Sequence, residues 1–135
     1  MEDKFNGVER RKFKRLQIGP IVKLHVNSAP ENKADFIGRS MEAVMIDISE
    51  GGTSVLLNSN IPVSSLVTAE FDLHNSRPSV KDRHQEISVL GKVCYNRPIN
   101  SRECRMGIIF TKMSDSDMAF ISQFISWERS RLPNG

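Results

Sequence analysis

Apolar and polar residues alternate with a period of two in several short segments, and this alternation is the sequence feature that most constrains the fold. It is clearest in residues 21–26, where Val22, Leu24 and Val26 are separated by lysine and histidine. Successive side chains of a strand point to opposite faces, so this segment predicts a strand with one buried face. Further strands are expected at residues 39–47, 53–57, 67–73, 87–95 and 103–110. Six short strands separated by turn-forming segments favour a small antiparallel β-barrel.

One segment near the C-terminus has helical periodicity instead. Ser114 and Asp117 resemble a capping box, in which a serine at the cap is followed three residues later by an acidic residue. The apolar residues that recur near helical spacing after this cap are Met118, Phe120, Ile121, Phe124, Ile125 and Trp127. Aromatic residues in such a pattern more often pack in a core than bind a partner. The sequence therefore predicts an all-β barrel closed by a C-terminal α-helix.

The length of 135 residues leaves room for one domain with a core of its own. No stretch approaches the ~18 consecutive apolar residues of a membrane span, and the N-terminus lacks the apolar centre of a secretory signal, so we expect a cytoplasmic protein. Cys94 and Cys104 would face each other across a hairpin that is symmetric about residue 99. A reducing cytosol favours two thiols there over a disulfide.

Positive charge is concentrated in one short segment. Residues 10–15, Arg-Arg-Lys-Phe-Lys-Arg, carry five positive charges in a chain with a net charge of +3, so the other residues together carry −2. A surface that binds long nucleic acids usually spreads its basic residues over one face, whereas this local cluster suits a small anionic ligand. Planar guanidinium groups match phosphate oxygens and the O6/N7 edge of guanine.

A second motif, Asp47-x-Ser49-x-x-Gly52, falls at the expected turn between two strands. A carboxylate can accept hydrogen bonds from the N1–H and N2 amino groups of guanine, and glycine permits close approach of the main chain to a ligand. Asp and Ser side chains also bond commonly to nearby backbone amides, so a purely local turn is the alternative interpretation. Together with the basic segment, the motif indicates a guanine nucleotide.

The motifs Arg11-x-x-x-Arg15 and Asp47-x-Ser49-x-x-Gly52 resemble the two motifs of the PilZ family, bacterial domains that bind the second messenger cyclic di-GMP. The resemblance continues through the late strands and the closing helix. It implies a six-stranded antiparallel PilZ-like β-barrel.

The domain that this resemblance implies covers residues 9–131. A flexible N-terminal tail is expected at residues 1–8, and a C-terminal tail at residues 132–135.

The resemblance also implies a ligand site. Its expected members are Arg10, Arg11, Arg15, Asp47, Ser49 and Gly52. The two motif arginines would contact phosphate and guanine, and the Asp and Ser would hold guanine or ribose from the barrel surface. In this family an arginine directly before the first motif is associated with a stacked pair of cyclic di-GMP molecules, so Arg10 predicts two ligands per chain. No cofactor is expected, and the scattered histidines and two cysteines predict no metal site.

The expected function is a cyclic di-GMP receptor or adaptor whose N-terminal arm becomes ordered on binding and signals to a partner protein. The family suggests control of motility, biofilm or surface polysaccharide. An enzyme is not expected, because the sequence contains no nucleophile–base pairing, Walker loop or dinucleotide fingerprint. A β-barrel that binds RNA or single-stranded DNA is one alternative, disfavoured by the scarcity of aromatic stacking residues. A PilZ-like adaptor that binds no ligand is the other.

Overall fold

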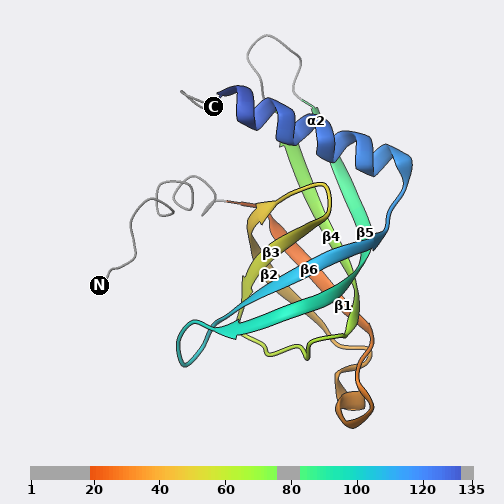
Figure 1. Cartoon of the computed structure of the whole chain (residues 1–135), viewed down its shortest axis with the longest axis vertical. Coiled ribbons are helices and arrows are strands. Elements are labelled where there is room, and N and C mark those ends of the chain that lie inside the picture. The colour runs from red at the N-terminus through yellow and green to blue at the C-terminus, as the bar shows by residue number, and fades with distance from the viewer. Residues whose placement is uncertain (1–18, 76–82, 132–135) are drawn as a thin grey trace.

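The computed structural model describes residues 19–75 and 83–131. The strands are β1 (Ile21–Ser28), β2 (Ser40–Ile48), β3 (Gly52–Leu57), β4 (Leu66–Asn75), β5 (Arg83–Pro98) and β6 (Cys104–Lys112), and the helices are the 3₁₀ helix η1 (Glu31–Phe36) and α2 (Asp115–Arg131). The strands form a closed barrel in the order β1-β2-β3-β6-β5-β4, with every neighbouring pair antiparallel. The predicted six-stranded barrel with a C-terminal helix is therefore confirmed (Figure 1).

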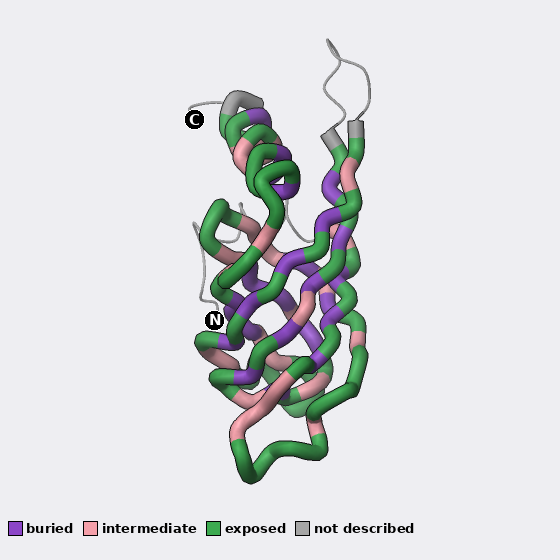
Figure 2. The backbone as a smooth tube through the Cα atoms, turned by 90° about the vertical axis from the view of Figure 1, so that its right-hand side faces the viewer, coloured by how far each residue is buried: buried purple, intermediate pink, exposed green. Residues whose placement is uncertain are grey.

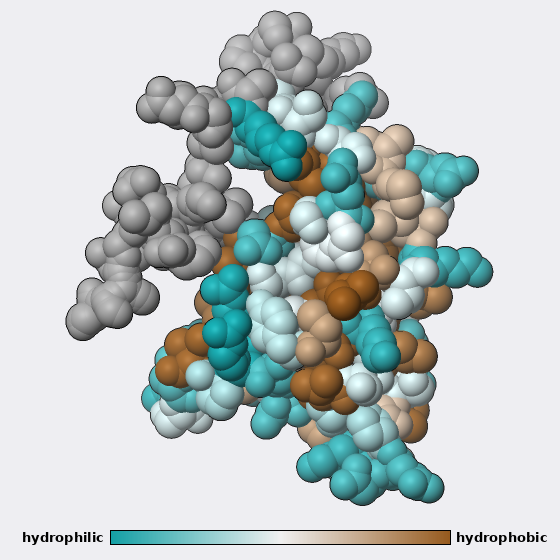
Figure 3. All heavy atoms as spheres, in the orientation of Figure 1, coloured by the Kyte–Doolittle hydropathy of each residue, from teal (hydrophilic) through white to brown (hydrophobic). Residues whose placement is uncertain are grey.

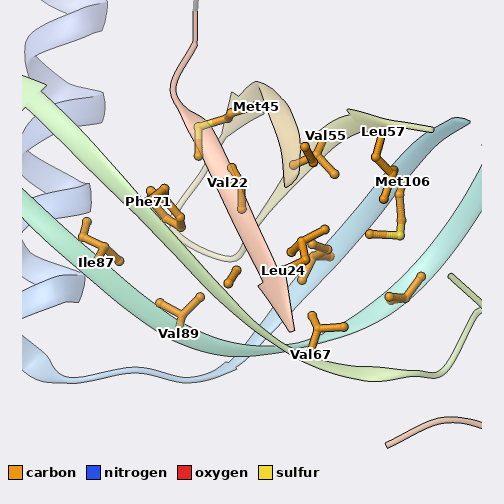
Figure 4. Packing of buried hydrophobic residues seen from close by; sticks show 14 of the residues in the cluster. Val22, Leu24, Met45, Val55, Leu57, Val67, Phe71, Ile87, Val89 and Met106 are labelled. Carbon is orange, nitrogen blue, oxygen red and sulfur yellow. The ribbon is translucent and has the colours of Figure 1, made fainter. Parts of the chain in front are cut away.

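The apolar residues of β1 face the inside of the barrel, and the polar residues between them face outward. Val22, Leu24 and Val26 of β1 are at most 1% exposed, whereas Lys23 between them is exposed. β4 and β5 show similar alternation, which Figure 2 displays as buried and exposed positions in turn, whereas β3 and β6 each contain three consecutive buried residues. Their apolar side chains meet inside the barrel, where Leu24 of β1 and Met106 of β6 lie in one cluster (Figure 4). Burial of this apolar surface is the main force that stabilises the fold.

Helix α2 is attached to the barrel through its first turn. The Ser114 hydroxyl accepts a hydrogen bond from the Asp117 N–H at 3.0 Å, as the predicted cap requires. The Asp117 carboxylate instead contacts β5, accepting from Gln85 Nε2 at 2.7 Å and from the Ser88 N–H at 3.3 Å. The acidic residue therefore anchors the helix to the barrel.

The inner side of α2 is apolar. Phe120 and Trp127 are buried and Phe124 is partly buried against the core, so these aromatic residues pack inward as predicted, and Ile121 is buried beside them. The prediction was wrong for Met118, which is 47% exposed because it lies on the outward side of the first turn. No helix in residues 19–75 or 83–131 is long and apolar enough to cross a membrane.

The two cysteines do not face each other, which corrects the expected hairpin. β5 and β6 pair Pro98 with Cys104, and Cys94 lies in a bulge of β5 between two paired positions. The hairpin is closed by a hydrogen bond from the Ile99 N–H to the Glu103 carbonyl at 2.8 Å, so its centre lies beyond residue 99. Both cysteines are free thiols.

Candidate functional site

The second motif forms the turn between β2 and β3, at the end of the barrel that carries α2 (Figure 1). The Ser49 N–H donates to the Gly52 carbonyl at 2.8 Å. The Ser49 hydroxyl also donates to that carbonyl, at 3.3 Å, and accepts from the Gly51 N–H at 3.2 Å. Ser49 therefore shapes its own turn, as the local interpretation expected, while its side chain stays exposed.

Gly52 is required by the packing of β3 against β6. A Cβ atom at this position would overlap the carbonyl oxygen of Ile108 and lie 3.3 Å from its carbonyl carbon. The adjacent Gly51 carbonyl accepts from the Phe110 N–H at 2.9 Å, which holds the two strands together at this point. The close main-chain approach expected at Gly52 is thus made to a neighbouring strand. A contact between Gly52 and a ligand stays a prediction.

Asp47 presents a carboxylate on the outer surface of the barrel. Its Oδ1 accepts a hydrogen bond from the Ser54 hydroxyl at 2.6 Å, and its Oδ2 lies 3.7 Å from Nη2 of Arg105. The side chain is 46% exposed, so these two neighbours orient the carboxylate and leave it accessible. Such an oriented, accessible acceptor can bind a ligand that offers N–H donors.

Sequence reasoning missed both of these neighbours. Ser54 lies opposite Asp47 in the β2–β3 register. The predicted turn between the two strands contains enough information to find that pair. Arg105 comes from β6, whose pairing with β3 joins segments about fifty residues apart in the chain. No local sequence signal identifies a contact of that kind.

Arg10, Arg11 and Arg15 lie outside the described residues. The chain next to them is described from Gly19, and the Pro20 carbonyl accepts from the Met45 N–H at 3.0 Å, close to Asp47 on β2. Arg15 precedes Pro20 by five residues in the sequence, and an extended chain of that length spans at most about 18 Å. Chain length therefore permits contact between the basic motif and the surface around Asp47.

The motif turn also contacts the C-terminal helix. The Ser122 hydroxyl of α2 donates to Oε2 of Glu50 at 2.9 Å. Glu50 occupies an unspecified position of the motif, between Ser49 and Gly52. The turn is therefore linked both to β6 and to the helix.

Two surface hollows lie elsewhere, over the outer face of β1 and β4. The first, of about 620 Å³, is lined in part by Lys23, Glu42 and Glu70. The second, of about 500 Å³, is lined in part by Asp72 and Glu86 together with Lys23 and Glu70. Neither includes a residue of the second motif. We call Glu42, Glu70, Asp72 and Glu86 the acidic face.

A third hollow, of about 700 Å³, is lined mainly by residues of β2, β3 and the β5–β6 turn, among them Leu56 and Arg102, and it also includes no residue of the second motif. Figure 3 shows apolar groups scattered between polar ones over the side of the molecule that it views, rather than one continuous apolar area. We use the term motif face for Asp47, Ser54, Tyr95, Arg97 and Arg105. Within the described part of the chain, histidine, cysteine, aspartate and glutamate form no group of three or more that could hold a metal ion.

Solved structures that align with this chain share little of its sequence. No curated protein sequence matches the chain significantly. The fold is similar to the structure of the Bacillus subtilis inhibitor of motility (MotI/DgrA), with 15% sequence identity and a TM-score of 0.60 over 84% of this chain and 49% of that one. The Borreliella burgdorferi PlzA protein in complex with c-di-GMP aligns with 16% identity and a TM-score of 0.47, over 91% of this chain and 41% of that one.

This chain therefore spans about half or less of the length of either protein. The sequence model of the PilZ domain matches residues 9–127, which is most of the chain. The chain belongs to the PilZ domain family.

Proposed function

We propose that this protein is a receptor for cyclic di-GMP. The observation that carries the proposal is the accessible Asp47 carboxylate, oriented by Ser54 and Arg105 on the motif face. Guanine offers the N1–H and N2 donors that such an acceptor binds. PilZ domains act as receptors or adaptors rather than as enzymes, and both motifs associated with ligand binding in the family are present in this sequence.

In this proposal the ligand is held from two sides. Asp47 and Ser49 bind guanine or ribose from the barrel, while Arg11 and Arg15 bind phosphate and the guanine O6/N7 edge. Binding orders the N-terminal arm, because the arginines gain their contacts only when ligand is present. The ordered arm changes the surface offered to a partner protein, in control of motility, biofilm or polysaccharide.

Arg10 extends the same arrangement to a second ligand. It directly precedes the first motif and adds another guanidinium group. Two stacked cyclic di-GMP molecules carry four phosphate charges, which the additional cation helps to neutralise. The expected stoichiometry is two ligands per chain.

Isothermal titration of the full chain with cyclic di-GMP tests the proposal. We expect saturable binding near two ligands per chain, a fall towards one in Arg10→Leu, and strong discrimination against cyclic di-AMP. Adenine presents an amino donor where guanine presents O6, and it lacks the N1–H that Asp47 accepts. Saturation at one ligand in the wild-type chain would reject the stacked pair alone.

The same titration separates the alternative functions. Equal affinity for the two cyclic dinucleotides, or tighter binding of a random oligonucleotide at ~150 mM salt, would favour the nucleic-acid-binding barrel. Failure of cyclic di-GMP to bind folded protein would favour the adaptor that has no ligand.

A further inference from the structure

Tyr95 lies at the end of a row of paired residues that begins at Asp47. The strand registers pair Asp47 with Ser54, Ser54 with Gly107, and Gly107 with Tyr95. Neighbouring strands are about 4.8 Å apart, so the three steps of this row span about 14 Å. A cyclic dinucleotide has two bases, and one molecule can offer a base to each end of the row.

The Tyr95 ring occupies the space that a side chain at residue 107 would fill. A Cβ atom on Gly107 would lie 2.6 Å from Cδ2 of Tyr95 and 2.8 Å from its Cζ, closer than real Cβ contacts. The ring therefore lies against the backbone of β6. Cζ of Arg97 lies 5.1 Å from the ring centroid, and Arg97 is exposed. The strand, the ring and the guanidinium group form three successive layers.

Arg97 also lies directly opposite Arg105 in the β5–β6 register. Like charges on directly opposite residues destabilise a sheet. The Asp47 carboxylate, 3.7 Å from Arg105, offsets part of this repulsion. The phosphates of an anionic ligand would offset more of it. The charges of the motif face therefore favour a phosphate-bearing ligand at this position.

We propose that Arg97, supported by the ring of Tyr95, stacks on a guanine base of cyclic di-GMP at the opposite end of the row from Asp47. This inference rests on the proposed function, because it assigns a further contact to the same ligand. Guanidinium planes and aromatic rings are common stacking surfaces for nucleobases. Asp47 recognises the hydrogen-bonding edge of one base, and Arg97 contacts the flat face of the other.

Titration of the full chain with cyclic di-GMP, comparing wild type with single variants, tests this contact. Arg97→Ala should weaken binding roughly 5- to 150-fold, which corresponds to about 1–3 kcal/mol for one stacked base. Arg97→Lys should also weaken binding, because it keeps the charge but loses the planar group. Tyr95→Phe keeps the ring and should bind like wild type.

Arg102→Ala is the matched control. Arg102 is exposed in the β5–β6 turn, and its replacement removes the same charge at a site away from Asp47. Wild-type affinity in both Arg97 variants would overturn the inference while leaving the proposed receptor intact. Wild-type affinity in Arg97→Lys alone would also overturn it, because charge would then account for the effect. A wild-type protein that does not bind cyclic di-GMP would instead refute the proposed function.

Discussion

The acidic face and the motif face differ in what they offer a ligand. The acidic face contains two of the hollows, and Lys23 lies there opposite Glu42 in the β1–β2 register and opposite Glu70 in the β1–β4 register. The motif face holds a fixed carboxylate between a hydroxyl and a guanidinium group. A hollow lined by carboxylates repels an anionic dinucleotide, whereas fixed donors and acceptors can bind one without such a hollow. The placement of charges, rather than the volume of a hollow, therefore indicates the site in this barrel.

The largest expected effect comes from the basic segment that would complete the motif face. Arg11→Ala or Arg15→Ala should cost about 2–4 kcal/mol of binding free energy, or 30-fold or more in affinity, because charge-assisted bonds to phosphate and guanine are lost. Titration with cyclic di-GMP measures the change. Arg129→Ala removes an exposed arginine on α2 and should leave the affinity unchanged. Wild-type affinity in either motif variant, on folded protein, would contradict the assignment.

A pair of matched aspartates compares the two faces directly. Asp47→Ala should weaken cyclic di-GMP binding by about 1.5–3 kcal/mol, since it removes a charged acceptor for guanine. Asp72→Ala removes a similar carboxylate from the acidic face, where the side chain is 56% exposed and lies 3.3 Å from Nδ1 of His84. It should leave binding unchanged. Equal losses of cyclic di-GMP affinity in the two variants would mean that the carboxylates of the two faces contribute equally to binding.

The two glycines of the motif turn should differ in how much their replacement lowers stability. Gly52→Ala should lower the free energy of unfolding by about 1–3 kcal/mol, because the added Cβ overlaps the Ile108 carbonyl and β3 or β6 must shift. Gly51→Ala is the control, because a Cβ there meets no atom within 4 Å. Denaturant unfolding measures both variants. Equal stability of the two variants would show that the packing of β3 against β6 does not require glycine at residue 52.

The smallest expected effect concerns the link between the motif turn and α2. Ser122→Ala removes the hydrogen bond to Glu50 and should lower stability by at most about 1 kcal/mol, because the bond is exposed. Ser126→Ala, at an exposed serine of the same helix, is the control. Thermal unfolding compares the two variants. A loss much larger than this would show that the turn and the helix are more strongly coupled than one exposed bond implies.

The sequence predicted the strands and the helix cap because these depend on neighbouring residues. The alternation around Val22 and the cap at Ser114 are local patterns. The prediction that the two cysteines face each other was wrong because strand register depends on how the turn closes. Cys94 also lies in a bulge that no simple pairing rule predicts. Met118 follows helical spacing, but only the docking of α2 on the barrel decides which side of its first turn is exposed.

The candidate site was predictable only in part, for the same reason. Asp47 and Ser49 were found because their motif is continuous in sequence. The neighbours that orient Asp47, and the contact between Tyr95 and Gly107, depend on strand pairings of β6 with β3 and β5. These pairings are results of barrel closure, and the local pattern of residues does not specify which side chains they bring together.

The closed order of the strands restricts how another protein can recognise this domain. A sheet with a free edge can accept an added strand from a partner through main-chain hydrogen bonds. In the closed part of the barrel that the described residues form, each strand has a neighbour on both sides, whereas residues 71–75 of β4 and 83–89 of β5 are paired only with each other. A partner that docks on the closed part must therefore recognise side chains, and strand addition through main-chain hydrogen bonds is restricted to the β4–β5 extension.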